Sequence, residues 1–182
     1  MAAVQTYKKS RGGDAKIGPS PILCGHSGMT PTILEFFPYG YDERQFCSPG
    51  FNLPVGLFQR SRFAEIPQYH TSADNLDFIR PDHLARSYRL IAETLDVLEN
   101  DAIYRNTMPK CEPQLGKYGL YGQVGGDKEA AAANMAMLWI LNLSDGTRSL
   151  LDIADHADLP FTLVFSTARK LQQLGLLLLD AR

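Results

Sequence analysis

Apolar side chains recur at helical spacing after residue 80. Pro81 and Asp82 suit the first turn of a helix, because proline lacks the N–H that is unpaired there and an acidic side chain favours the helix N-terminus. An apolar side chain then returns every three or four residues as far as Asn100, which predicts one buried helix face. That face consists of Leu84, Tyr88, Ile91, Leu95 and Leu98. We therefore expect a packed amphipathic helix over residues 81–100.

Helical spacing returns near the C-terminus. The expected elements are, in order, an alanine-rich helix over 127–143, a short helix that Ser149 and Asp152 begin as a capping box, a helix over 161–174 and a strand over 176–179. Gly175 suits the end of the third helix, since glycine readily adopts the left-handed conformation found there. A helix, a short helix, a longer helix and a strand are the pattern of a winged-helix domain.

Short apolar runs between turn residues precede the first helix. Residues 32–37 and 51–58 predict strands, and residues 66–70 predict an extended segment that ends on a histidine. Residues 1–30 predict a partly ordered, solvated lead-in. Prolines and glycines concentrate over 105–126, which predicts an extended linker. The expected organisation is therefore an α/β region over 1–104, this linker, and a winged helix-turn-helix domain over 127–182.

Composition and charge limit the classes of binding partner that we expect, but they say little about the activity. The chain has 182 residues, of which 45% are hydrophobic, so it can bury enough apolar surface to fold. Its net charge of −2 gives no reason to expect a nucleic-acid or anionic-membrane partner. Residues 127–182 contain five basic and seven acidic side chains. The expected exposed positions of the third helix are Thr162, Ser166, Arg169, Lys170 and Gln173, of which two are cationic. This charge favours a packing or protein-interaction role over DNA reading.

The cysteines and the apolar stretches indicate the cellular compartment in which we expect the protein. Cys24, Cys47 and Cys111 form no CxxC pair, so neither a zinc knuckle nor a thioredoxin-type redox pair is expected. The N-terminus has no apolar core of signal-peptide length. The longest apolar stretches, 135–143 and 174–179, are too short to span a bilayer. We therefore expect a cytoplasmic protein without a membrane partner.

The most specific chemistry surrounds His70. It lies at the end of an expected extended segment with polar turn residues beside it, which is a common place for a metal ligand. The segment YHTSADNLDFI resembles the terminal motif of the co-catalytic zinc exopeptidases, the aminopeptidase group that also includes the glutaminyl cyclases. The resemblance implies that His70 is a zinc ligand. It implies supporting positions for Thr71 and Asp74, with Asp74 shaping the turn rather than touching metal.

An upstream loop resembles a second part of the same group. The segment YDERQFCSPG is similar to a Ser-Asp-His loop whose aspartate lies over the substrate pocket, although Tyr41 and Glu43 stand where serine and histidine are usual. The resemblance implies that Asp42 is the pocket aspartate, with Glu43 and Arg44 as further substrate-pocket candidates. Cys47 lies in the loop without a histidine base beside it, which does not favour a thiol nucleophile.

The fuller resemblance is to a bacterial subfamily of aminopeptidase-like proteins and extends from Tyr7 to the winged helix. The segments that carry it are FFPYGYDERQ, CSPGFNLPVG, EPQLGKYGLY and LNLSDGTRSLLDIAD. Members of the group hold two zinc ions through a first His, a bridging Asp, a Glu, a second Asp and the last His, and a separate Glu is the general base. In the family all but the last ligand come from sequence that precedes this chain's first residue.

Nothing in residues 1–40 replaces those ligands, since His26 stands alone there. A catalytic zinc needs three protein ligands, so His70 by itself would hold zinc weakly or not at all. We therefore expect a partial zinc aminopeptidase-like protein with no complete catalytic set, inactive as this chain alone. The intact family implies a peptide-like substrate.

An α/β fragment without its partner strands leaves apolar surface uncovered. This favours a homo-oligomer, such as a dimer, or association with a missing N-terminal half. Two other functions stay open. One is a non-catalytic protein-interaction or self-association module built on the winged helix. The other is a DNA-binding regulator, which the charge does not favour.

Overall fold

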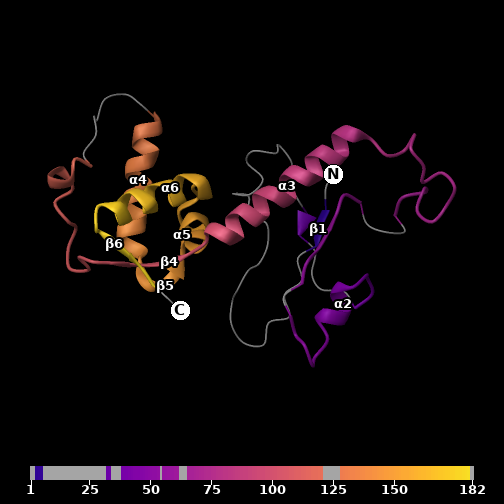
Figure 1. Cartoon of the computed structure of the whole chain (residues 1–182), viewed down its shortest axis with the longest axis horizontal. Helices are drawn as coiled ribbons and strands as arrows, with labels where there is room; N and C mark the ends of the chain where they lie inside the picture. The colour runs from indigo at the N-terminus through magenta and orange to yellow at the C-terminus, as the bar shows by residue number, and fades with distance from the viewer. Residues whose placement is uncertain are drawn as a thin grey trace. The chain divides into compact units, whose positions relative to one another are not determined.

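The computed structural model describes residues 3–5, 32–33, 38–53, 55–61, 65–120 and 128–180. The chain divides into two compact units, Met1–Thr94 and Leu95–Arg182, which are described separately (Figure 1). Apart from residues 3–5, the expected lead-in lies outside the described residues, and so does His26. The resulting picture is a mixed α/β chain whose second unit is a winged helix.

The first unit contains a three-stranded sheet. Its strands are β1 (Ala3–Gln5), β2 (Thr32–Ile33) and β3 (Leu57–Gln59), in the order β2-β1-β3. Strand β1 is parallel to β2 and antiparallel to β3. The strand expected over 32–37 is present at residues 32 and 33, and residues 34–37 lie outside the described part of the chain.

The strand expected over 51–58 is shorter than the sequence indicates. Only its end belongs to β3, because the backbone before it folds back in turns. The N–H of Phe51 donates to the carbonyl of Ser48 at 3.1 Å, and that of Leu53 donates to the carbonyl of Phe46 at 3.0 Å. These bonds use backbone groups that a longer strand would offer to a neighbouring strand.

Helix α3 (Pro81–Asn100) has the bounds that the sequence predicts. The expected burial of its apolar face is wrong. All five side chains of that face, Leu84, Tyr88, Ile91, Leu95 and Leu98, are 46–74% exposed. The buried apolar side chains of the helix are instead Leu90 and Val97. Helical periodicity shows which side chains share a face, and the described residues supply no surface that covers this one.

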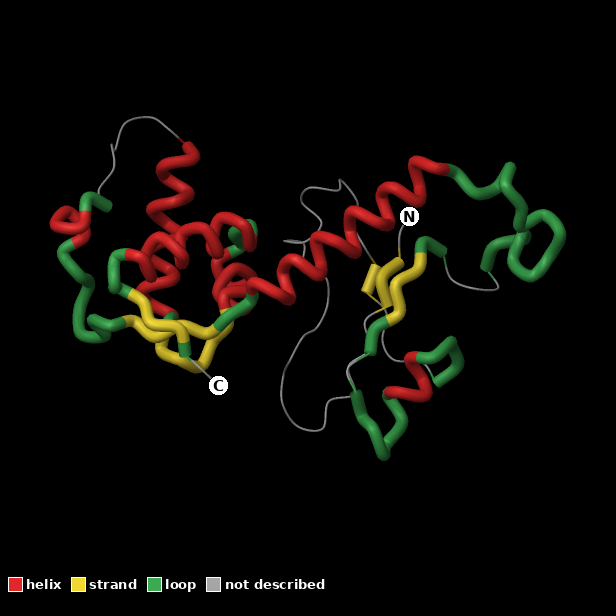
Figure 2. The backbone as a smooth tube through the Cα atoms, in the orientation of Figure 1, coloured by secondary structure: helices red, strands yellow, loops and turns green. Residues whose placement is uncertain are grey.

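The second unit has the elements of a winged helix. They are β4 (Ile103–Asn106), the 3₁₀-helix η1 (Leu115–Tyr118), α4 (Lys128–Leu143), β5 (Asp145–Ser149), α5 (Leu150–Ala157), α6 (Phe161–Gln173) and β6 (Leu177–Leu179). Helices α4, α5 and α6 pack against one another (Figure 2). Strands β5 and β6 each pair antiparallel with β4, which gives the order β5-β4-β6. The expected order of three helices and a final strand is therefore confirmed.

Part of the expected linker over 105–126 is folded into this unit. Residues 105 and 106 belong to β4, and Leu115 of η1 is fully buried. The Asn106 side chain donates to the carbonyl of Leu141 in α4 at 2.8 Å. Residues 121–127 lie outside the described residues. The described part of the stretch is therefore not an extended linker, because buried contacts hold it in place.

The core of the second unit follows the helical spacing. The apolar spacing over 161–174 marks Phe161, Val164, Phe165, Ala168, Leu171 and Leu174. Phe165 is partly exposed and Leu174 is 36% exposed, and the other four are buried. They meet the fully buried side chains of Ile140, Leu150, Ile153, Leu176 and Leu177 in the same core. The positive φ of Gly175, 73°, confirms the expected end of this helix region.

The predicted capping box at the start of α5 is present. Ser149 Oγ accepts from the N–H of Asp152 at 3.2 Å, and the Asp152 carboxylate accepts from the N–H of Ser149 at 3.0 Å. The two N–H groups between them are also paired. Leu150 donates to the carbonyl of Ala102 and Leu151 donates to the Asp101 carboxylate, at 3.0 and 2.9 Å. Burial raises the pKa of Asp101. The start of α5 is thus joined to the residues just before β4.

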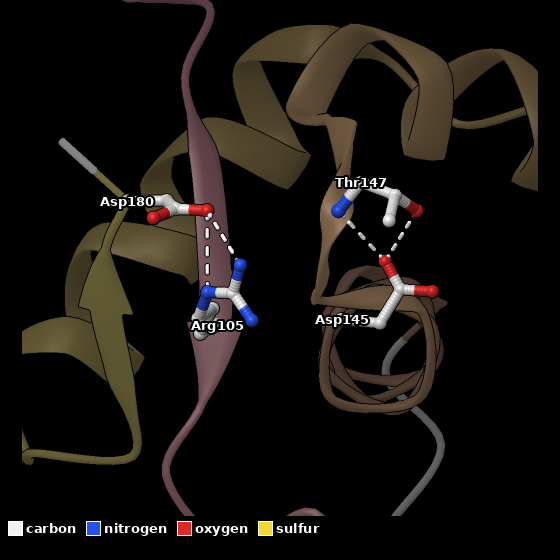
Figure 3. A network of polar contacts seen from close by, with 4 residues as sticks. All are labelled: Arg105, Asp145, Thr147 and Asp180. Carbon is white, nitrogen blue, oxygen red and sulfur yellow. Dashed lines mark hydrogen bonds and ion pairs between the residues drawn. The ribbon is translucent and has the colours of Figure 1, made fainter. Parts of the chain in front are cut away.

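A close approach on the sheet requires glycine at position 146. Gly146 has a φ of 89°, and a Cβ atom there would lie 2.6 Å from Cζ of Arg105. Arg105 Nε donates to the Asp180 carboxylate at 3.2 Å, and its Nη2 lies 3.2 Å from the same oxygen (Figure 3). Next to it, Asp145 accepts from the N–H and the hydroxyl of Thr147, which lowers the pKa of Asp145. Only glycine leaves Arg105 free to reach Asp180.

We predict that Gly146→Ala lowers the free energy of unfolding by about 1–3 kcal/mol, because it strains a left-handed residue and displaces Arg105 from Asp180. Gly119→Ala is the matched control, since Gly119 also has a positive φ but open space around its Cα. The loss in free energy of unfolding should be smaller for Gly119→Ala than for Gly146→Ala. Urea unfolding followed by Trp139 fluorescence measures both, and equal losses would show that the contact with Arg105 is unimportant.

Candidate functional site

The predicted pocket loop folds as a turn that leads into the short helix α2 (Glu43–Phe46). The Glu43 carboxylate is buried and accepts from the N–H of Tyr41 through both oxygens, each at 3.0 Å. A Cβ atom at Gly40 would collide with this carboxylate. Asp42 is exposed, and its carbonyl accepts from the N–H of Gln45. Of the two acidic candidates, Asp42 faces solvent while Glu43 stabilises the turn.

Two further side chains of the loop have definite surroundings. The exposed guanidinium of Arg44 lies over the Tyr39 ring, with Cζ 5.9 Å from the ring centre. The Cys47 thiol is buried and lies within hydrogen-bond distance of the carbonyls of Leu53 and Val55, at 3.3 and 3.5 Å. The thiol therefore helps to close the loop that follows α2.

His70 lies in a turn rather than at the end of an extended segment, so that expectation is wrong. The N–H of Tyr69 donates to the carbonyl of Ile66, and that of Thr71 donates to the carbonyl of Gln68, both at 3.1 Å. His70 itself has a φ of 57°, in the left-handed region. Consecutive turns replace the strand because the local backbone groups bond to one another. The His70 side chain is exposed.

The residues after His70 hold these turns together. Thr71 Oγ1 donates to the carbonyl of Gln68 at 2.9 Å and accepts from the N–H of Ala73 at 3.2 Å. Asp74 contributes its N–H, which donates to the carbonyl of Thr71 at 3.1 Å. The Asn75 side chain accepts from the N–H of Asp77 at 2.9 Å. Asn75 is one of the polar residues that the sequence places in the turn after His70, and an asparagine side chain commonly bonds the backbone of such a turn.

A pair of tyrosines joins the loop to the turn. The hydroxyl groups of Tyr41 and Tyr69 lie 3.0 Å apart and share a hydrogen bond. The Tyr69 ring stacks on the imidazole of His70, with ring centres 4.0 Å apart and planes 14° from parallel. The two segments that the sequence analysis selected, 28 residues apart at these tyrosines, therefore lie side by side. The linking role of Tyr69 was missed, since hydroxyl pairing leaves no local pattern.

The donors available for a metal are few in this part of the chain. Within the described ranges, no cluster of three or more His, Cys, Asp or Glu side chains could hold a metal ion. A catalytic zinc needs three protein ligands, and His70 offers a single exposed imidazole. The described residues therefore fit one position of such a site and not the whole of it.

The winged-helix unit exposes the expected positions of α6. The side chains concerned, Thr162, Ser166, Arg169, Lys170 and Gln173, are all exposed. Arg169 Nη1 donates to the Gln172 side chain at 3.4 Å. In the portion of the chain that the structure describes, no helix combines the length and the apolar character needed to cross a bilayer.

We predict that Tyr69→Phe lowers the pKa of Tyr41 from about 12 toward its ordinary value of about 10, because the hydrogen bond with Tyr69 is the main cause of the high value. A raised pKa stabilises the fold below about 10, and this contribution is lost as the pH rises through about 12. Ultraviolet titration of tyrosinate measures the change.

The titration needs an assignment, since the chain has eight tyrosines. Tyr41→Phe should remove the titration near pH 12, and Tyr88→Phe is the control for loss of an exposed tyrosine. An unchanged high-pH titration in Tyr69→Phe would refute the link between the two segments.

Two family models match the chain and meet just before β4. Residues 2–101 match a family model described as domain of unknown function (DUF4910), and residues 102–178 match one described as winged helix-turn-helix. The first match covers more than half of the chain, so the chain belongs to this family. The second confirms the winged-helix expectation and begins just before β4.

Two relatives come from Clostridium acetobutylicum. A protein named as a polysaccharide biosynthesis protein with an aminopeptidase-like domain is 44% identical over 178 residues, which cover 97% of this chain and 41% of the relative. A crystal structure named as that of a peptidase superposes with a TM-score of 0.80 at 41% identity, over 98% of this chain and 39% of that one. The chain is thus similar to aminopeptidase-like proteins and spans about two fifths of their length.

Proposed function

We propose that the chain supplies one zinc ligand and the substrate-pocket loop to an aminopeptidase-like site whose other ligands lie in sequence outside it. The observation that carries the proposal is the Tyr41–Tyr69 hydrogen bond of 3.0 Å. It holds the loop with Asp42 against the turn with His70, so the two segments that resemble zinc exopeptidase motifs belong to one surface. The names of the two relatives support the same class of protein.

Each candidate side chain has a distinct part in this proposal. His70 supplies an exposed imidazole, and the stacked Tyr69 ring fixes its orientation. Asp42 supplies an exposed carboxylate that suits the cationic amino terminus of a peptide-like substrate. Glu43 positions Asp42 by holding the preceding turn. Arg44, over the Tyr39 ring, is the remaining polar side chain at the loop surface.

Zinc bound at such a site supplies a Lewis acid and an activated water. The described residues fit only one ligand position, so we assign no catalytic step to this chain by itself. We propose instead that the isolated chain is inactive and holds zinc weakly. A self-sufficient peptidase would instead bind zinc and hydrolyse its substrate by itself, so zinc binding and hydrolysis by the isolated chain distinguish the two cases.

We predict that the isolated chain neither binds zinc stoichiometrically nor hydrolyses aminoacyl 4-nitroanilides. Hydrolysis should appear when the chain is co-expressed with the part of the Clostridium acetobutylicum protein that lies outside the match. His70→Ala should then lower the rate by more than about 100-fold, since loss of a group that merely supports a ligand costs 10–100-fold.

His83→Ala is the matched control, because His83 is a partly exposed histidine of α3 outside the loop and the turn. It should keep the full rate. Equal rates for the two variants would refute the ligand role of His70. Stoichiometric zinc and hydrolysis in the isolated chain would refute the proposed inactivity.

A further inference from the structure

The two units differ in how much apolar surface they bury. In the second unit, side chains from α4, α5, α6 and β6 make a continuous core. Among the described residues of the first unit, the buried apolar side chains are Cys47 and Leu90. The described residues of this unit therefore bury little apolar surface, and their exposed apolar side chains are available to another polypeptide segment.

Helix α3 and the turn before it carry much of the uncovered apolar surface, and residues 39–53 expose further apolar side chains. Leu84, Tyr88 and Ile91 are 60%, 74% and 46% exposed, and Leu95 and Leu98 continue the same spacing along the helix. The turn adds Leu76, Phe78 and Ile79, which are exposed as well. Single exposed apolar side chains are ordinary, but a contiguous stripe of this kind marks an interaction surface.

The residues beside the stripe suit close packing. The flanking positions as far as Leu95 include Ala85, Ser87, Ala92 and Thr94, which are small and uncharged, while the exposed Glu99 lies beside Leu95 at the end of the helix. The charged side chains Arg86 and Arg89 lie at other positions around the helix. A wide uncharged face is typical of a helix that covers a sheet or another helix inside a domain.

The comparisons indicate which polypeptide covers this face. The match takes in 97% of this chain but 41% of the relative, and the solved structure gives 98% and 39%. The same fold is therefore found in longer proteins with more than half of their length outside the match. A second copy of this chain is the alternative occupant, and the homodimer outcome of the test below distinguishes it.

We propose that this face of α3 is the interface for the aminopeptidase-like portion that the relatives carry outside the match. The helix and the turn at 76–79 then complete one shared core, whether that portion lies on the same polypeptide or on another. The inference rests on the proposed function, because that function identifies the partner, but it does not require that zinc is bound. In this arrangement, the contact through α3 brings the pocket loop and His70 next to the other residues of the aminopeptidase-like site.

We predict that the chain co-expressed with the outside part of the Clostridium acetobutylicum protein purifies as a one-to-one complex, measured by size-exclusion chromatography with light scattering. Ile91→Asp should reduce the recovered complex at least about 10-fold, because it places a charge in the apolar face. Arg86→Asp is the matched control on the same helix and should leave recovery unchanged. Thermal unfolding of the isolated variants should match that of the parent chain, since both positions are exposed.

Three results would overturn the proposal. They are recovery of the chain without the co-expressed part, a complex that Ile91→Asp leaves intact, and a homodimer that Ile91→Asp disrupts while no mixed complex forms. The last would identify a second copy as the occupant. A mixed complex that depends on Ile91 but neither binds zinc nor hydrolyses peptides would refute the proposed function and leave the interface standing.

Discussion

The second unit depends on β4 being the middle strand of its sheet. Strands β5 and β6 pair with β4 and not with each other, so without β4 neither has a partner in the described sheet. The buried Tyr104 carries this strand into the core, and its hydroxyl donates to Gln172 of α6 at 3.4 Å. The carbonyl of Ala102, just before the strand, accepts from the first residue of α5. The winged helix therefore begins before β4 and not at α4.

The described contacts of the first unit differ in kind from those of the second. Apart from the three-stranded sheet, the side-chain hydrogen bonds among its described residues are mostly local, such as those of Glu43 with Tyr41 and of Thr71 with Gln68. The Tyr41–Tyr69 bond and the bond from Arg60 to the carbonyl of His83 join more distant segments. Such contacts shape loops, but they bury little apolar surface. A loop and a turn can thus be well formed by local hydrogen bonds while α3 keeps an apolar face exposed among the described residues.

Local signals explain what could be predicted from the sequence. Helix α3 has the expected bounds because Pro81 and the apolar repeat act within the helix itself. The capping box at Ser149 formed for the same reason. The predictions that were wrong have two causes. Local turns replaced the extended segment before His70 and most of the strand expected over 51–58. The other errors involved distant partners. Strand β4 was missed since its pairing residues lie some 40 to 75 positions later, and burial of Leu84 needed a surface that the described residues do not supply.

In the candidate site too, the candidate residues could be selected from the sequence, but the contacts between its segments could not. Motifs identified His70 and Asp42, because residue identity is a property of the sequence. Their arrangement depends on Tyr69, whose hydroxyl reaches Tyr41 and whose ring stacks on the imidazole, and no periodicity announces such a contact. Glu43 could be selected as an acidic candidate, but its burial against the N–H of Tyr41 could not be foreseen.

The charges of the winged helix bear on which kind of partner it meets. On the sheet, Arg105 pairs with Asp180 at 3.2 Å and Arg148 with Asp145 at 3.6 Å, so both guanidinium groups already face carboxylates. Binding a phosphate backbone would require breaking these pairs, and the gain from counterion release grows only with the number of cations that reach phosphate. Arg169 on α6 is turned toward Gln172. Because intramolecular carboxylates already oppose the two sheet arginines, fewer cations of this domain are available to a phosphate backbone than its arginine count suggests.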